Sequence, residues 1–97
     1  MKFVQVIEMQ TSRFDEMRKL GDEWEAAIGD DRRARQLVMC QDRDNPGHYV
    51  NIVFFDSYEE AMANSSHPVT QEFAAKMAEL ADGPGVFHNL DVVEERD

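Results

Sequence analysis

The pattern of hydrophobic and polar positions predicts four β-strands in this chain. They cover residues 2–9, 33–42, 48–56 and 86–94, and the first and third of them are the most apolar. The turn sequence Asp-Asn-Pro-Gly over residues 44–47 separates the second strand from the third. These two strands are therefore expected to form a β-hairpin.

Between the first two strands, apolar residues recur at steps of three and four, which predicts a helix with one apolar face. This stripe consists of Phe14, Met17, Gly21, Trp24 and Ile28. Ser12 is expected to cap the helix, with Asp15 three residues later as the acidic partner of a capping box. Gly29 is expected to end it.

A second helical region follows the third strand and is expected to be interrupted. The capping box over residues 57–60, Ser-Tyr-Glu-Glu, opens a short helix through about Asn64. Proline disfavours helix in the residue before it and suits a first helical turn, so His67-Pro68 should end this helix and begin another. The second helix has an apolar stripe of Val69, Phe73, Met77 and Leu80, and Gly-Pro-Gly at residues 83–85 ends it.

The resulting order is β-α-β-β-α-β, with the second helix broken. This is the split βαβ, or ferredoxin-like, arrangement: an α+β fold with a four-stranded antiparallel sheet. We expect the first and third strands in the centre and the more polar second and fourth strands at the edges. A chain of 97 residues without repeats or linkers should form one domain over residues 1–97.

Both faces of the third strand are apolar, which predicts association. One face carries His48, Val50, Ile52 and Phe54, and the other carries Tyr49, Asn51, Val53 and Phe55. Helices cover only one face of such a sheet. Each large apolar side chain left in water forgoes about 1.5–3 kcal/mol, so we expect a two-fold homodimer formed through the second face. The alternative is a monomer with the usual few exposed apolar residues.

The net charge restricts the possible binding partners, and the cysteine content and the length of the apolar runs restrict the cellular location. Twenty acidic against ten basic residues give a formal net charge of −10, which disfavours nucleic acid and membrane surfaces as partners. Cys40 is the only cysteine, so no intramolecular disulfide forms. No apolar run approaches the roughly 20 residues that span a bilayer. We therefore expect a cytoplasmic protein.

Three segments of the chain resemble the dimeric α+β barrel superfamily, in particular its antibiotic biosynthesis monooxygenase-like branch. They are FVQVIEM at 3–9, HYVNIVFFDSYEEAMANSSHPVTQEFAAKM at 48–77 and FHNLDVVE at 87–94. Residues 56–61 resemble the strand-to-helix junction of the family, and residues 67–70 are similar to its entry into the last helix. The superfamily also holds isomerases, heme-degrading enzymes and peroxidases, so the resemblance is specific for the fold rather than for one reaction.

The resemblance implies a cofactor-independent monooxygenase acting on a small aromatic or polycyclic substrate, which activates oxygen after losing a proton. It implies a catalytic His67 as base, with Asn51 and Asn89 bound to a substrate oxygen. Trp24, Tyr49 and Phe87 would line the pocket. No cofactor and no metal are expected. Heme degradation is disfavoured, because the first strand has Gln5 and no asparagine, and residues 58–81 contain no tryptophan.

Two other functions stay open: a non-enzymatic small-ligand-binding or stress-responsive protein, and a structural dimer with filled cores. Asn51 and Asn89 each need a hydrogen-bond partner within an apolar strand. On one shared face they would lie roughly 9–10 Å apart, but Asn89 at an edge can equally face solvent. Core packing explains Trp24, and surface hydrogen bonding explains the histidines. His48 and His88 are expected on the face opposite to the asparagines.

Overall fold

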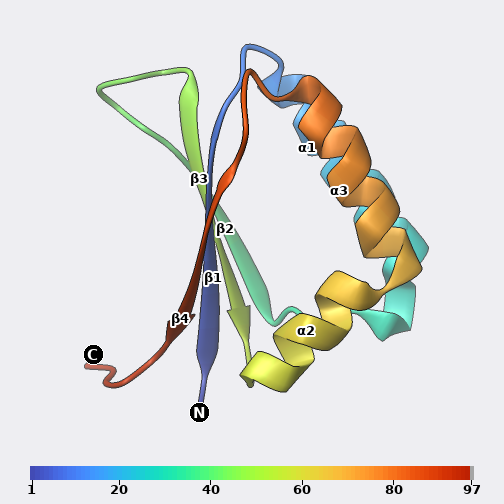
Figure 1. Cartoon of the computed structure of the whole chain (residues 1–97), viewed down its shortest axis with the longest axis vertical. Coiled ribbons are helices and arrows are strands. Elements are labelled where there is room, and N and C mark those ends of the chain that lie inside the picture. The colour runs from blue at the N-terminus through green and yellow to red at the C-terminus, as the bar shows by residue number, and fades with distance from the viewer. Residues whose placement is uncertain (97) are drawn as a thin grey trace.

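The helices form one layer that covers a single face of the sheet, and the other face is open (Figure 1). The structure is a computed structural model that describes residues 1–96, so Asp97 lies outside it. Its elements are β1 (Phe3–Gln10), α1 (Phe14–Ile28), a 3₁₀ turn (Gly29–Asp31), β2 (Gln36–Gln41), β3 (His48–Phe55), α2 (Tyr58–Ser66), α3 (Pro68–Leu80) and β4 (Val86–Asp91). The predicted α+β class and order of elements are confirmed.

The sheet is antiparallel throughout, in the order β2-β3-β1-β4, with β1 and β3 in the centre as predicted. Ile7 of β1 lies opposite both Asn51 of β3 and Phe87 of β4. Gln5 lies opposite Asn89. Because directly opposed residues point to the same side of a sheet, both asparagines share one face, which is the face toward the helices.

The two edge strands are shorter than predicted. β2 begins at Gln36 rather than at residue 33. The residues before it are held by other contacts: Ala34 is buried in the core, and Arg33 pairs with Glu60 of α2. β4 ends at Asp91 rather than at residue 94, because its partner β1 begins at Phe3, directly opposite Asp91.

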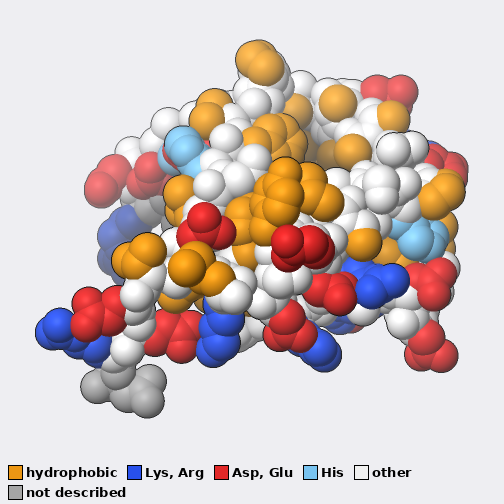
Figure 2. Space-filling view, turned by 60° about the horizontal axis from the view of Figure 1, so that its bottom comes forward, with side chains coloured by type: hydrophobic (Ala, Val, Ile, Leu, Met, Phe, Trp, Pro, Cys, Tyr) orange, Lys and Arg blue, Asp and Glu red, His pale blue; other side chains and the backbone are white. Residues whose placement is uncertain are grey.

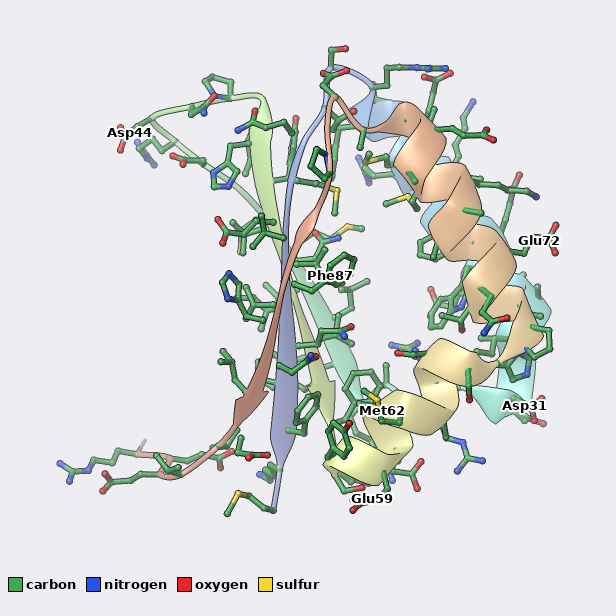
Figure 3. All side chains as sticks on the ribbon, in the orientation of Figure 1. Asp31, Asp44, Glu59, Met62, Glu72 and Phe87 are labelled. Carbon is green, nitrogen blue, oxygen red and sulfur yellow. The ribbon has the colours of Figure 1, made fainter. Side chains whose placement is uncertain are left out.

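Side chains fill the space between sheet and helices mainly at its two ends. At one end Phe3, Ala34, Phe55 and Ala61 form a buried cluster with Val53 and Met62 (Figure 3). At the other end Met9, Thr11 and Met17 are buried. Between them, three helix-facing residues of the edge strands stay exposed: Leu37 to 41%, Met39 to 37% and Phe87 to 60%. The middle of this face is therefore only partly covered.

The predicted cap of α1 is wrong. The helix begins at Phe14, Arg13 holds the cap position without a side-chain cap, and Ser12 is exposed. The buried Thr11 hydroxyl accepts a hydrogen bond from the Arg13 N–H (2.9 Å) and donates one to the Leu80 carbonyl (2.8 Å). The chain is thus fixed one residue earlier, by a side chain that also joins β1 to the end of α3.

The other helix boundaries follow the sequence more closely. Ser57 accepts a hydrogen bond from the Glu60 N–H, as expected of a cap, although α2 continues to Ser66. The break at His67-Pro68 is confirmed. Gly29, at a φ of 50°, ends α1; this left-handed backbone conformation is one that glycine adopts without strain.

The end of the molecule at which α2 and both chain ends lie has a mixed surface. Figure 2 shows hydrophobic side chains in the middle of this view, with acidic and basic side chains around them. Tyr58 of α2, half exposed, belongs to this end. Within residues 1–96, no helix combines the length and the apolar character needed to cross a membrane.

Candidate functional site

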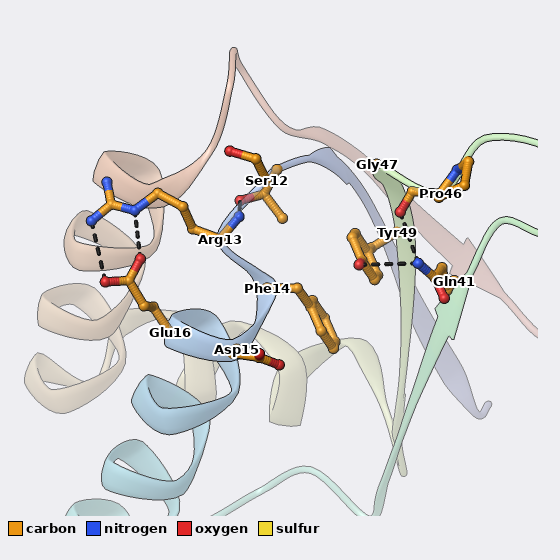
Figure 4. Close-up of a pocket in the computed structure, with 10 residues that line it drawn as sticks. Ser12, Arg13, Phe14, Asp15, Glu16, Gln41, Pro46, Gly47 and Tyr49 are labelled. Carbon is orange, nitrogen blue, oxygen red and sulfur yellow. Dashed lines mark hydrogen bonds and ion pairs between the residues drawn. The ribbon is translucent and has the colours of Figure 1, made fainter.

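A pocket of about 600 Å³ opens between the start of α1 and the β2–β3 hairpin (Figure 4). Its walls come from the β1–α1 connection, the end of β2 and the start of β3. The lining residues are Thr11, Ser12, Arg13, Phe14, Asp15, Glu16, Gln41, Pro46, Gly47 and Tyr49. Only Tyr49 was among the predicted site residues, because the other segments are brought together by the tertiary fold.

An aromatic pair forms one wall of this pocket. The rings of Phe14 and Tyr49 stack with their centroids 4.0 Å apart and their planes 1° apart. The Gln41 side-chain amide donates to the Tyr49 hydroxyl (3.2 Å) and to the Pro46 carbonyl (2.9 Å). The tyrosine is therefore fixed both at its ring and at its hydroxyl. Such a wall suits a flat, apolar ligand with polar groups at its rim.

The connection beneath the pocket is held by backbone as well as side-chain bonds. The Thr11 N–H donates to the Gly47 carbonyl at 3.0 Å, which joins the end of β1 to the turn before β3. Arg13 pairs with Glu16 in the first turn of α1. The Glu16 carboxylate consequently has its pKa lowered, mainly by the hydrogen bond from Arg13. Arg13 and Glu16 thus neutralise each other, and Asp15 leaves the rim with one net negative charge.

Asn51 lies next to Tyr49 on the same face of β3, and it is the most informative of the predicted residues. It is only 7% exposed, and among the described residues nothing hydrogen-bonds to its Oδ1. Its neighbours across the sheet are the apolar Ile7 and Met39. A buried acceptor without a partner costs about 1–3 kcal/mol, so Asn51 marks a place where the described residues supply no donor; it follows Tyr49 on β3 but is not among the residues that line the pocket.

Asn89 and Phe87 share this face but lie at the β4 edge. Both are exposed, and Phe87 extends from β4 toward the side of the helices (Figure 3). The Asn89 Oδ1 accepts a hydrogen bond from the Gln5 side-chain amide at 3.2 Å. The two asparagines therefore differ: the carbonyl of Asn89 has a partner within the protein, whereas that of Asn51 has none.

Trp24 lies between α1 and α3. Its indole N–H donates to the Thr70 hydroxyl (3.0 Å), and its ring contacts that of Phe73 at a centroid distance of 5.9 Å. It lines a small cleft of about 100 Å³ together with residues such as Leu20 and Val69. This cleft is separate from the pocket beside Tyr49.

His67 occupies the junction between α2 and α3, and both nitrogens of its ring are engaged. Nδ1 accepts a hydrogen bond from the Val69 N–H (3.1 Å), so Nε2 carries the proton and donates to Asp31 (3.1 Å). The structure thus brings Tyr49 and Asn51 together and leaves His67 in a cap of α3.

A second polar cluster lies on the open face of the sheet, where sequence reasoning gave no site. Glu8 of β1 is held between two imidazoles: its carboxylate oxygens lie 3.1 Å from His48 Nε2 and 2.8 Å from His88 Nε2. His48 Nδ1 lies 3.0 Å from Asp42. The prediction that both histidines point away from the asparagines is confirmed. Glu8 joins the two histidines because the register of β1 with β3 and β4 places it on the same face.

These contacts perturb the protonation of the cluster. The hydrogen bond to Asp42 and then that to Glu8 raise the pKa of His48, against the effect of burial. The hydrogen bonds from His88 and His48 lower the pKa of Glu8, and that from His48 lowers the pKa of Asp42. Within residues 1–96, no group of three or more His, Cys, Asp or Glu side chains is arranged to hold a metal ion.

The rest of the open face is apolar. Apart from the polar cluster at one end and Lys2 at the other, its central residues are Val4, Val6, Val38, Val50, Ile52, Phe54 and Leu90. Phe54 is 36% exposed and Leu90 47% exposed, although both are large hydrophobic residues. Cys40, on β2 opposite Val50, is exposed at the margin of this face.

Comparison with solved structures defines the class of fold: the chain has the fold of the antibiotic biosynthesis monooxygenase-like proteins. It is similar to SnoaB, a cofactor-independent oxygenase from Streptomyces nogalater, with a TM-score of 0.82, 12% identity, and 97% of this chain and 95% of that one covered. A candidate antibiotic biosynthesis monooxygenase from Caulobacter crescentus has a TM-score of 0.81 at 16% identity, with 96% and 91% covered.

A third similar structure, a candidate antibiotic biosynthesis monooxygenase from Nitrosomonas europaea, has a TM-score of 0.77 at 10% identity and covers 95% of this chain and 90% of its own. No protein-family model and no curated protein sequence matches the chain. At these identities the likeness establishes the fold, and the site has to be argued from the residues of this chain.

Proposed function

We propose that this protein binds a small aromatic or polycyclic molecule beside Tyr49 and oxidises it as a cofactor-independent monooxygenase. The observation that carries the proposal is the buried Asn51 Oδ1, which lacks a hydrogen-bond partner among the described residues and lies next to the stacked aromatic wall. A phenolic hydroxyl is a donor that satisfies this acceptor while its ring packs on an aromatic side chain. Similarity to SnoaB, named a cofactor-independent oxygenase, supports the reaction class.

The reaction needs no electrons from the protein if the phenolic substrate carries an activated ring methylene. Loss of a proton gives an electron-rich anion that reduces O₂. The methylene carbon then gains one oxygen atom as a carbonyl, and the other oxygen atom leaves as water with the two methylene hydrogens. The substrate thus supplies all four electrons. Binding by Asn51 would orient the substrate and keep it in the geometry for this step.

The other predicted residues have different parts in this proposal. Phe87 and Asn89, exposed on the same face of the sheet, extend the proposed binding surface toward β4. Trp24 holds α1 to α3 through Thr70. For His67, both of whose ring nitrogens are engaged, we propose a helix-capping role rather than that of a base.

We also propose that the protein forms a homodimer through the open face of the sheet. A sheet of four strands with six to eight residues each presents a face of about 20 by 25 Å. This is about 500 Å² in projection, which is smaller than the roughly 800 Å² per partner of a standard interface and is of the size of a small one. A second copy is the favoured occupant because the polar cluster holds two acidic groups and two imidazoles, so two identical faces can meet without uncompensated like charge when both imidazoles are protonated.

Oxygen uptake tests the proposed reaction. A dihydroxyanthrone, which has phenolic hydroxyls and an activated methylene, serves as the substrate, and its spontaneous oxidation in buffer is subtracted. We expect the protein to accelerate uptake and Asn51→Ala to lower this rate about tenfold or more, since it removes the orienting hydrogen bond. Asn64→Ala is the matched control, because Asn64 Oδ1 is also buried without a partner but lies in α2.

Absence of acceleration by the unmodified protein would contradict the proposed reaction. Equal loss of activity in Asn51→Ala and Asn64→Ala would contradict the role of Asn51. If the anthrone raises the melting temperature without oxygen uptake, the protein is a binding protein rather than an enzyme.

A further inference from the structure

Four side chains form one continuous hydrogen-bonded network across the open face. Asp42, at the end of β2, contacts His48 of β3; His48 contacts Glu8 of β1; and Glu8 contacts His88 of β4. The network therefore extends from the residue directly after β2, across β3 and β1, to β4. His48 is the most enclosed of its members, with a side chain 22% exposed, and Glu8 and Asp42 are each 35% exposed.

The contacts of His48 define its protonation state. Both of its ring nitrogens face carboxylate oxygens. A neutral imidazole has only one N–H, so one nitrogen would then point a lone pair at a carboxylate. The geometry is satisfied when His48 is an imidazolium that donates from both nitrogens. With Glu8 and Asp42 ionised and His48 charged, these three groups carry a net charge of −1, and a proton on His88 brings the network to zero.

We propose that this network makes the association of two copies depend on pH: the open faces meet when the network is neutral and separate when it loses a proton. This inference rests on the homodimer proposed above. Association removes the network from water, and an uncompensated charge is costly in such a place, whereas a neutral set of hydrogen-bonded ion pairs is much less so. Two copies with one negative charge each would also repel each other.

Within the four strands, no lysine or arginine lies beside the network; Arg43, directly after Asp42, is exposed in the β2–β3 loop, outside the strands. The titratable side chains at this end of the face are Glu8 of β1, Cys40 of β2, Asp42 directly after β2, His48 of β3 and His88 of β4. The basic residue Lys2 lies at the opposite end of β1, where it pairs with Glu95. Compensation therefore has to come from a proton on an imidazole.

The direction of the effect follows from this charge count. As the pH falls, a proton on the second imidazole gives the network its second positive charge, and the dimer becomes tighter. Well below the ordinary carboxylate range near 4, protonation of Glu8 and Asp42 leaves excess positive charge and the dimer weakens again. The dimer is accordingly tightest in weakly acidic solution.

Sedimentation velocity of the full chain over a range of concentrations measures this dependence at about pH 6 and about pH 8. About 0.5 M NaCl screens the general repulsion between chains of net charge −10. We expect a dissociation constant about tenfold higher at the higher pH. A tenfold change requires association to shift the protonation of the network by only about half a pH unit in each of the two copies, because the two contributions add. His88→Gln keeps a side-chain donor toward Glu8 and should abolish the difference. His67→Gln, outside the open face, should retain it.

The outcomes separate the inference from the dimer itself. A monomer at both pH values, at concentrations well above those of ordinary cellular proteins, contradicts the dimer and with it this inference. A dimer with the same dissociation constant at both pH values overturns the inference and leaves the dimer in place. Equal pH dependence in His88→Gln and the unmodified protein overturns it too. His88 is exposed on an edge strand, and circular dichroism checks that the variant folds.

Discussion

Phe14 and Tyr49 stack face to face across the space between α1 and β3, with their ring centroids 4.0 Å apart. α1 packs mainly against α3, whereas the contacts of the sheet with the helix layer include those of α2 with β1 and β3. The aromatic pair is therefore a direct link between the first turn of α1 and the sheet, and it forms a wall of the pocket. Stability of the fold and shape of the pocket depend on the same contact.

Replacing Phe14 by alanine should reduce the free energy of unfolding by about 1.5–3 kcal/mol, less than for a fully buried phenylalanine because the ring is half-buried. Tyr49→Phe keeps the stack and removes only the hydrogen bond from Gln41, so it should cost about 1 kcal/mol or less. Urea denaturation at fixed protein concentration measures both. Equal losses in the two variants would show that the stack contributes little.

Thr11→Val should destabilise the protein by about 1–3 kcal/mol, because it leaves the Arg13 N–H and the Leu80 carbonyl without their hydroxyl partner in a buried place. Ser12→Ala, the matched control one residue further on, should change the free energy of unfolding by less than about 0.5 kcal/mol. Urea denaturation compares the two. The opposite order would mean that Ser12 caps α1 after all.

Alternation along each strand was sufficient to predict which of its residues share a side, but not which side of the sheet the helices cover. The parity of positions placed Tyr49 and Asn51 on one side of β3 and His48 on the other, and the register confirms this. Neighbouring strands were also predicted, because the most apolar segments had to be central. These features depend on local periodicity and on the amount of apolar surface, both of which are present in the sequence itself.

The surroundings of the site were less predictable, since they depend on contacts between distant segments. Trp24 and Phe14 belong to the same apolar stripe, yet Trp24 contacts α3 and Phe14 contacts β3. Helical periodicity indicates a common face but not which neighbour each residue meets. Similarly, the hairpin was predicted, but its register, which places Gln41 opposite Tyr49, was not. Ser12 matched a capping pattern that the buried Thr11 made unnecessary.

The contribution of the open-face network to folding stability should be greatest in weakly acidic solution. The raised pKa of His48 stabilises the fold below the ordinary histidine pKa, and this stabilisation is lost as the pH rises through the raised value. The lowered pKa values of Glu8 and Asp42 stabilise it above their ordinary range, and this is lost as the pH falls through the lowered values.

Urea denaturation from about pH 3 to about pH 9 tests this dependence. In His48→Gln the difference in unfolding free energy from the unmodified protein should be largest between about pH 4.5 and about pH 6.5 and smaller on both sides. A difference that stays constant over the whole range would contradict the role of His48 as a charged donor to both carboxylates.

Reactivity of Cys40 should report whether a second copy covers the open face. The thiol is exposed in the single chain and lies opposite Val50. Its rate of labelling by a maleimide should therefore fall as protein concentration rises. Val6→Arg, in the centre of this face, should abolish the protection by preventing association. Leu37→Arg changes an exposed residue of β2 on the helix-facing side and should retain it. A labelling rate independent of concentration would contradict the dimer.

The affinity of a dihydroxyanthrone, measured by equilibrium dialysis without oxygen so that no turnover occurs, tests most directly whether Asn51 holds the ligand. Loss of one buried hydrogen bond should weaken binding about tenfold in Asn51→Ala. Asn64→Ala, which alters an equally unpartnered amide in α2, should bind like the unmodified protein. Equal affinity of the unmodified protein and Asn51→Ala for the anthrone would contradict the site proposed beside Tyr49.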